Sequence, residues 1–205
     1  MCSSLTSLPR RNLIVLSSEL KDHYAYVCEV MLPSTDIIVI DQTNIVESMV
    51  SQLGDYIWDN IAVIFHGQHD KENNIISIFS RNISTNIDVI ELDPGYDDIM
   101  KLIGLLRRHL HKDLHIFACD VGGNDGFKYM LTKADKKFNF TGGIYFSTNR
   151  TGNPTEGNPT EVDVIDFAKP DWILEMNTKR GLIYETTGSI SPLLLYVRDY
   201  SRLTF

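Results

Sequence analysis

Short, uninterrupted apolar runs recur along this chain and constrain its fold more than any other feature. Runs without alternation of apolar and polar residues are typical of strands buried on both faces of a parallel sheet. Segments with apolar residues at helical spacing lie between several of them, so the expected order is strand, helix, strand. The sequence therefore predicts an α/β fold, a three-layer α-β-α sandwich around a mostly parallel sheet. The predicted strands are residues 12–17, 36–41, 61–65, 114–118 and 144–146.

Helices are expected between these strands. Residues 45–53 carry apolar side chains at helical spacing. A second helix opens at Asp93, and its C-terminal turn accounts for the basic cluster at 107–112, because cations suit the negative end of a helix. A third helix includes residues 127–134, and the mixed pattern of residues 19–31 is compatible with a further one.

The remaining apolar segments predict small antiparallel elements. Residues 75–79 and 87–92 flank a turn and predict a small β-hairpin after the strand that ends in His-Gly. Residues 171–176 and 182–184 predict a terminal strand pair. The chain is divided into an N-terminal tail (1–11), one α/β domain (12–187) and an apolar C-terminal tail (188–205) that either packs on the domain or joins a partner.

Charge and cysteine content exclude several classes of protein. The net charge is −8 and the acidic residues are scattered, whereas phosphate binding needs a basic face, so no nucleic-acid partner is expected. No apolar run is long enough for a membrane helix, and the first residues lack the order of a signal peptide, so we expect a cytoplasmic protein that is not bound to a membrane. The three cysteines, Cys2, Cys28 and Cys119, favour a reducing compartment over a disulfide framework.

Two of the predicted strands end in residues with useful chemistry. His66-Gly67 follows residues 61–65, and Cys119 follows residues 114–118. The working site of an open α/β sheet lies beyond the carboxyl ends of its strands, so neighbouring strands would bring the imidazole and the thiol together. A histidine can take the proton of a thiol and make it a nucleophile. A glycine-rich turn and a helix follow Cys119, and the backbone N–H groups of Gly67 and Cys119 are the predicted oxyanion hole.

Other interpretations of these residues are possible. Taken singly, Cys119 is a buried structural thiol and His66 a polar strand terminator; their matching positions favour the functional interpretation. A C-x5-R phosphatase loop is excluded because Asp125 stands where the arginine is needed. His66 and His69 form a spaced pair without a nearby cysteine, so neither a metal nor another cofactor is expected. Three further histidines, His109, His111 and His115, are interpreted as surface residues.

A block ending in His-Gly followed by a block ending in Ala-Cys resembles the caspase-like cysteine peptidases, which include gingipains, legumains, metacaspases and separases. In caspases about 50 residues separate the histidine from the cysteine, and here the step from residue 66 to residue 119 is 53 positions. Within this group the chain most resembles an uncharacterised domain near the N-termini of very large bacterial repeat adhesins. The matching pieces are Leu13–Ser17, Ile37–Asp41, Ile61–Gly67, His115–Asp120 and Asp171–Glu175.

This resemblance implies that His66 is the general base and Cys119 the nucleophile of a peptidase that forms an acyl-enzyme. It also implies an S1 pocket at the strand after the cysteine, which points to Tyr145, Ser147 and Thr148. Asp120 would attract a basic P1 residue. Phe117 stands where caspases carry glutamine, so aspartate specificity is not expected.

Two other functions stay open at this point. The first is a catalytically inactive caspase-like module that binds a protein partner or assembles through its sheet edge or apolar tail. The second is a flavodoxin-like or nucleotide-binding sheet, which rests only on Gly122-Gly123 beside a helix start. The expected partner is a polypeptide, either as a substrate or as a bound protein, and the sequence does not indicate an oligomeric state.

Overall fold

A computed structural model describes residues 12–41, 43–70, 72–118, 123–147, 174, 176–182 and 192–198. Its main sheet has seven strands in the order β10-β9-β8-β7-β3-β1-β2. The five neighbouring strands β8, β7, β3, β1 and β2 run parallel to one another. β9 runs antiparallel to β8, and β10 runs antiparallel to β9. The predicted α/β fold with a mostly parallel sheet is therefore confirmed. The strands are β1 (Asn12–Ser17), β2 (Thr35–Ile40), β3 (Trp58–Phe65), β7 (Leu110–Ala118), β8 (Ile144–Phe146), β9 (Met176–Asn177) and β10 (Gly181–Leu182).

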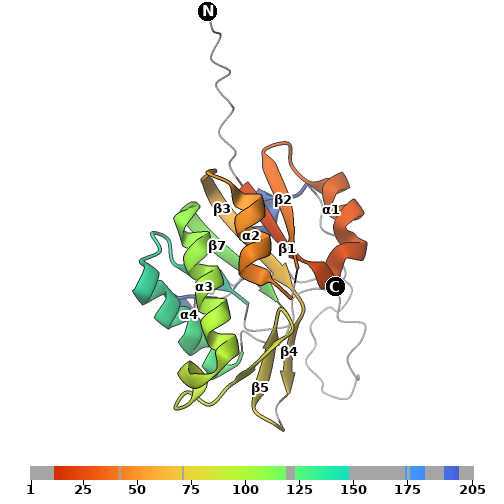
Figure 1. The fold of residues 1–205 in the computed structure, drawn as a ribbon. Coiled ribbons are helices and arrows are strands. Elements are labelled where there is room, and N and C mark those ends of the chain that lie inside the picture. The colour runs from red at the N-terminus through yellow and green to blue at the C-terminus, as the bar shows by residue number, and fades with distance from the viewer. Residues whose placement is uncertain are drawn as a thin grey trace, which may run out of the picture.

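Helices cover both faces of this sheet and make three layers (Figure 1). Alternate residues of β1 show that both faces are buried, because Leu13 packs in one hydrophobic cluster and Ile14 in the other. One face carries α2 (Ile45–Leu53), α3 (Pro94–Arg108) and α4 (Asp125–Phe138). The other carries the 3-10 helix η1 (Ser18–His23), α1 (Tyr24–Val30) and the short 3-10 helix η4 (Pro192–Leu195). None of the helices in the described ranges is both long and apolar enough to cross a bilayer.

The described part of the C-terminal tail packs into the second hydrophobic cluster. Leu193 and Tyr196 have no exposed surface, and Val197 forms an isolated antiparallel bridge with Met31. The Leu32 N–H donates to the Tyr196 carbonyl at 2.8 Å. Residues 192–198 therefore complete the layer that α1 begins, although they lie beyond the predicted domain boundary at residue 187.

The same segment explains why the prediction for His115 was wrong. His115 is only 4% exposed, and its Nδ1 lies 2.7 Å from the hydroxyl of Tyr196, 81 residues further along the chain. Burial lowers the pKa of His115 to about 3, so the imidazole is neutral. His111 is exposed, as predicted, and His109 is half-buried. The sequence around His115 could not predict its burial, because Tyr196, which packs against it, comes from the far end of the chain.

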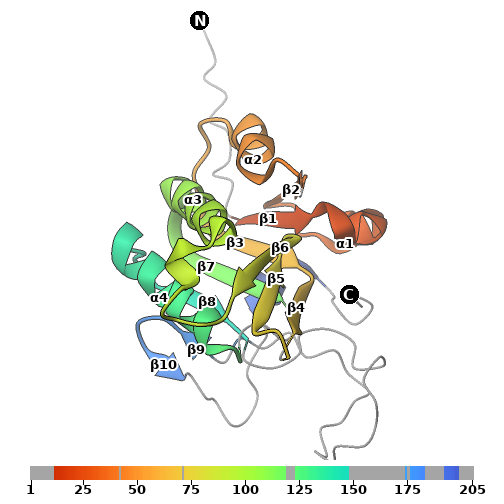
Figure 2. The same cartoon turned by 60° about the horizontal axis from the view of Figure 1, so that its bottom comes forward.

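A small antiparallel sheet follows β3 after the single residue His66. Its strands are β4 (Gly67–Asp70), β5 (Ile75–Ile78) and β6 (Arg81–Ser84), and Figure 2 turns this part of the molecule toward the viewer. The predicted hairpin exists, but its second strand is β6 and not residues 87–92, of which 90–92 form a 3-10 turn. Phe79 and Ser80 both have positive φ, which closes a two-residue turn and brings the chain back at Arg81.

Within the described residues, the terminal strand pair is present as β9 and β10. Each strand has two described residues, and residues 171–173 and 175 lie outside the described part of the chain. β9 pairs with β8 through Asn177 opposite Tyr145, which places the pair at the edge of the main sheet.

Local sequence sets the ends of the two long helices. Asp93 caps α3 by accepting from the Gly95 N–H at 2.8 Å, and Pro94 follows at the first helical position. Asn124 caps α4 by accepting from the Phe127 N–H at 3.1 Å. α4 ends at Asn139, whose left-handed conformation is typical of a C-cap.

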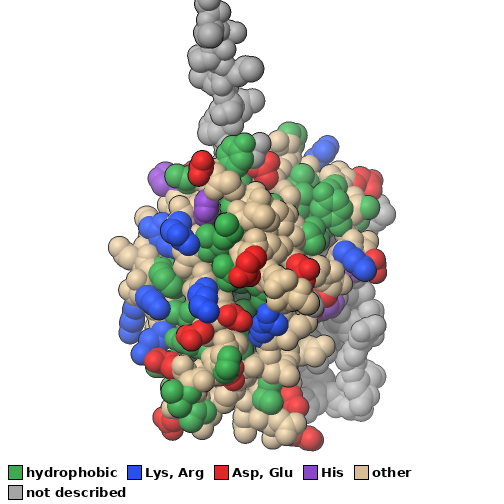
Figure 3. Space-filling view, in the orientation of Figure 1, with side chains coloured by type: hydrophobic (Ala, Val, Ile, Leu, Met, Phe, Trp, Pro, Cys, Tyr) green, Lys and Arg blue, Asp and Glu red, His purple; other side chains and the backbone are tan. Residues whose placement is uncertain are grey.

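Basic side chains gather over α3 and α4 on the face shown in Figure 3. Arg107 and Arg108 occupy the last turn of α3, and Lys136 and Lys137 the last turn of α4. Cations at these positions stabilise the helix C-termini, so the prediction that the basic cluster belongs to a helix end is confirmed for the two arginines.

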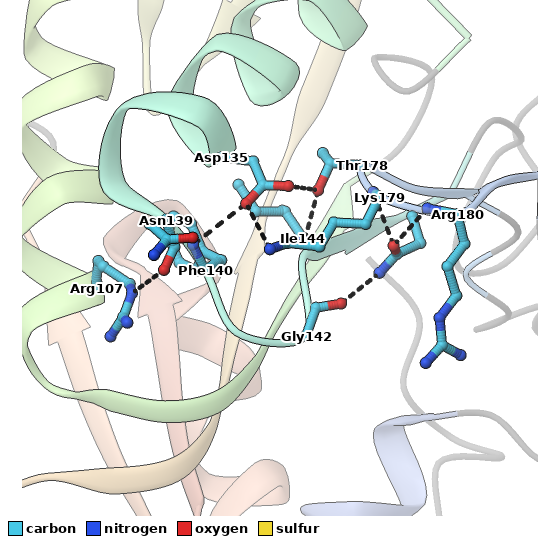
Figure 4. A network of polar contacts seen from close by, with 10 residues as sticks. Arg107, Asp135, Asn139, Phe140, Gly142, Ile144, Thr178, Lys179 and Arg180 are labelled. Carbon is cyan, nitrogen blue, oxygen red and sulfur yellow. Dashed lines mark hydrogen bonds and ion pairs between the residues drawn. The ribbon is translucent and has the colours of Figure 1, made fainter.

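A buried carboxylate fastens the last turn of α4 to β8 and β9 (Figure 4). Asp135 is 7% exposed and accepts from the Phe140 N–H at 3.2 Å and from the Thr178 hydroxyl at 2.7 Å. The Thr178 hydroxyl oxygen in turn accepts from the N–H of Ile144, the first residue of β8, at 2.9 Å. This network lies at the edge of the sheet where the parallel strands begin, which we call the amino edge.

Candidate functional site

The ends of β3 and β7 meet at the opposite, carboxyl edge of the sheet. The two strands are parallel neighbours, with Ile64 opposite Phe117 and Phe65 opposite Ala118. Both strands therefore finish at the same level. His66 is the next residue after Phe65, and Cys119, the next after Ala118, lies outside the described residues. The predicted adjacency of the two strand ends is thus present, while the position of the thiol itself is not described.

His66 is half-buried, and its backbone N–H is bound by Glu19, which lies just after the end of β1. Its N–H donates to Oε1 of Glu19 at 2.6 Å. Glu19 belongs to η1, which begins directly after β1, the neighbour of β3 on the other side. A hydrogen bond to a carboxylate is stronger than one between neutral groups, so it restrains the point where the chain leaves β3. The sequence prediction did not include Glu19, whose contact with His66 spans 47 residues.

A second contact joins the histidine-bearing segment to the start of α4. Gly67, a predicted oxyanion-hole residue, is buried in β4, and His69 lies two positions further on. Nδ2 of Asn124 lies 3.0 Å from Nε2 of His69. Because the Oδ1 of Asn124 accepts from Phe127, its amide nitrogen faces His69, and Nε2 of His69 is the acceptor. Asn124 was not among the predicted site residues, although an asparagine just before a helix is a typical capping signal.

The predicted substrate-binding residues occupy different places. Asp120 and Thr148 lie outside the described residues. Tyr145 is opposite His115 in the sheet, with ring centroids 5.1 Å apart, and burial raises its pKa. Three residues separate His115 from the end of β7, which puts Tyr145 about 10 Å behind the carboxyl edge. Ser147 lies two positions closer to that edge and is buried.

Phe117, two residues before Cys119, has a structural role. It is 1% exposed and packs in the second hydrophobic cluster with Ile64, its neighbour across the sheet. A buried phenyl ring at this position offers no polar contact to a substrate. Packing therefore accounts for the phenylalanine at this position.

A cavity of about 680 Å³ lies at the amino edge, at the opposite end of the strands from His66. Polar residues that line it hydrogen-bond to one another or to nearby backbone. Asn60 donates to Asn12 at 2.9 Å, and Asn12 donates to the Leu195 carbonyl at 2.7 Å. Asp59 accepts from Lys112 at 3.1 Å. These contacts join β1, β3, β7 and η4, so the residues that line this cavity hold elements of the fold together.

Among the residues described, no group of three or more His, Cys, Asp and Glu side chains is arranged to hold a metal ion. Comparison of the chain with protein-family models, with curated proteins and with solved structures found no match.

Proposed function

We propose that this chain is a caspase-like cysteine peptidase in which Cys119 is the nucleophile and His66 the general base. The observation that carries the proposal is the pairing of Phe65 with Ala118 at the ends of adjacent parallel strands. Residues that directly follow two such ends leave the sheet side by side. From this register we infer that the Cys119 thiol and the His66 imidazole face each other.

The proposed reaction is acyl transfer in two steps. His66 takes the proton of the Cys119 thiol, and the sulfur attacks the peptide carbonyl carbon. The N–H groups of Gly67 and Cys119 stabilise the negative oxygen of the tetrahedral intermediate. The C–N bond breaks, the leaving amine takes the proton from His66, and a thioester remains. Water activated by His66 then hydrolyses the thioester and regenerates the thiol.

The contacts around His66 support this assignment. Glu19 restrains its backbone, and Gly67 adds no side chain beside the proposed oxyanion site. Ser147, together with Asp120 and Thr148, is the proposed substrate-binding set, and Tyr145 supports the set from behind the edge. The reaction uses a polypeptide substrate and needs no cofactor. A reduced thiol fits the cytoplasmic location expected from the sparse cysteines.

The alternative is a caspase-like module without catalytic activity that binds a protein partner. The observation that favours it is the position of β2 at the end of the main sheet, where none of the described strands pairs with its outer side. An open strand edge can pair with a strand of another chain.

Peptide hydrolysis tests the proposal. The purified chain is incubated with a mixed peptide library, and cleavage is followed by mass spectrometry. Loss of the general base in His66→Ala should lower the rate by about 100-fold or more, and Cys119→Ala should abolish it. His111→Ala is the matched control, because this imidazole is exposed at the amino edge. Absence of cleavage by the wild type, or equal rates in wild type and His66→Ala, would contradict the proposal.

A further inference from the structure

Asn124 uses both ends of its side chain although it is almost completely buried. It is 8% exposed. Its carbonyl oxygen caps α4 through the Phe127 N–H, and its amide nitrogen donates to Nε2 of His69. Aspartate would cap the helix as well but carries no donor for His69, and serine or threonine would have to serve both partners with the single oxygen of a shorter side chain. The contact with His69 therefore adds a requirement that capping alone does not impose.

Tight packing keeps the partners of this hydrogen bond in fixed positions. A Cβ atom at Gly126 would come within 2.7 Å of the Thr85 carbonyl oxygen, so the first turn of α4 lies directly against the residue that follows β6. β6 pairs with β5, and β5 pairs with β4 at His69 opposite Ile76. The small sheet thus reaches α4 at two places, Thr85 and His69. These contacts prevent β4 from sliding along α4.

We propose that His69 and Asn124, which stands five residues after Cys119, are a positioning pair that fixes β4, and with it the preceding His66, relative to the start of α4. This inference rests on the proposed function. Nε2 of His69 is the atom that meets the Asn124 amide, at 3.0 Å. The charged groups nearest in sequence are Asp70 on its own strand and Asp125 on α4, which is paired with Lys128. Neither His69 nor Asn124 takes part in the chemical step.

Matched substitutions separate the effect of the His69–Asn124 hydrogen bond from the effects of the helix cap and of side-chain volume. His69→Leu removes the acceptor and keeps the volume, whereas His69→Gln offers an amide oxygen near the place of Nε2. Asn124→Gly removes the donor, and because glycine is tolerated at the N-cap, it costs the helix little. The measurement is the rate of iodoacetamide modification at Cys119, followed by peptide mapping, with Cys28 in the same sample as the reference. Thermal unfolding of each variant is measured alongside.

In His69→Leu and in Asn124→Gly, the loss of the hydrogen bond should displace β4 and slow Cys119 modification about tenfold. His69→Gln should restore a rate close to that of the wild type, and the Cys28 rate should not change. Wild-type Cys119 that reacts no faster than Cys28 would sink the proposed function itself. A fast Cys119 that is equally fast in His69→Leu would overturn the positioning pair and leave the dyad standing. A rate in His69→Gln as low as in His69→Leu would also overturn it.

Discussion

The two edges of the main sheet use polar residues in different ways. At the amino edge, the described polar side chains bind one another and neighbouring backbone across strands, as in the contacts of Asp135 with Thr178 and of Asn60 with Asn12. At the carboxyl edge, Glu19 and Asn124 each hold one point of the segment that contains His66 and His69. The amino-edge groups therefore hold the fold together, whereas the carboxyl-edge groups position the short segment that contains His66 and His69. Substitutions at the two edges should therefore change different measured quantities.

The largest expected effect on stability is at the amino edge. Asp135→Ala leaves the Phe140 N–H and the Thr178 hydroxyl without their buried acceptor, and we expect a loss of about 3 kcal/mol in the free energy of unfolding. Urea unfolding measures this value, and Asp135→Asn, which keeps one acceptor oxygen, should lose less. The rate of Cys119 modification should not change. A loss below about 1 kcal/mol, or slower Cys119 modification in the folded variant, would break the distinction between the edges.

The next effect is a pH dependence of the free energy of unfolding. It arises from His115, which lies in the middle of β7, between the two edges. The pKa of His115 is about 3 in the folded chain and about 6.5 when exposed. The unfolded chain therefore binds a proton that the folded chain excludes, so this contribution is complete above pH 6.5 and is lost as the pH falls. At pH 5 the free energy of unfolding should be about 2 kcal/mol lower than at pH 7.5.

His115→Asn is the control for this pH effect. Its side-chain oxygen lies near the place of Nδ1 and accepts from Tyr196, but it does not titrate. Comparison of the two chains over the same pH range cancels the contribution of other groups, including Asp113, whose pKa is raised by burial. Parallel pH profiles of stability for wild type and His115→Asn would contradict the assignment.

The smallest of these effects is at the carboxyl edge and concerns reactivity. Glu19→Ala releases the N–H of His66, and we expect Cys119 modification to slow about tenfold. Because Glu19 is exposed, the free energy of unfolding should change by less than about 1 kcal/mol. Glu47→Ala, an exposed glutamate on α2, is the matched control. Equal Cys119 rates in Glu19→Ala and Glu47→Ala would show that the contact does not position His66.

Short sequence patterns predicted those elements of the fold whose position depends on residues close together in the sequence. The apolar runs located the parallel strands, and Asp93 marked the start of α3. The return strand of the hairpin was misplaced because two non-glycine residues, Phe79 and Ser80, adopt positive φ in the turn. No general turn signal indicates such a pair.

In the candidate site, too, the sequence did not predict contacts between residues that lie far apart along the chain. His66 could be singled out because a histidine at a strand end has a recognisable position. Glu19 and Asn124 could not, because their contacts with the histidine segment cross 47 and 55 residues of sequence. His115 was misassigned for a similar reason, since the residues that bury it come from the far end of the chain.

The most direct measurement of the proposed dyad is competition among the three cysteines for a limiting thiol reagent. Wild type and His66→Ala are treated with iodoacetamide or a peptidyl acyloxymethyl ketone, and the adducts at Cys2, Cys28 and Cys119 are mapped over time. A thiol activated by a neighbouring imidazole should react at least about tenfold faster than the other two, and His66→Ala should remove this advantage. Modification of Cys119 no faster than Cys2 and Cys28, or unaffected by His66→Ala, would contradict the dyad.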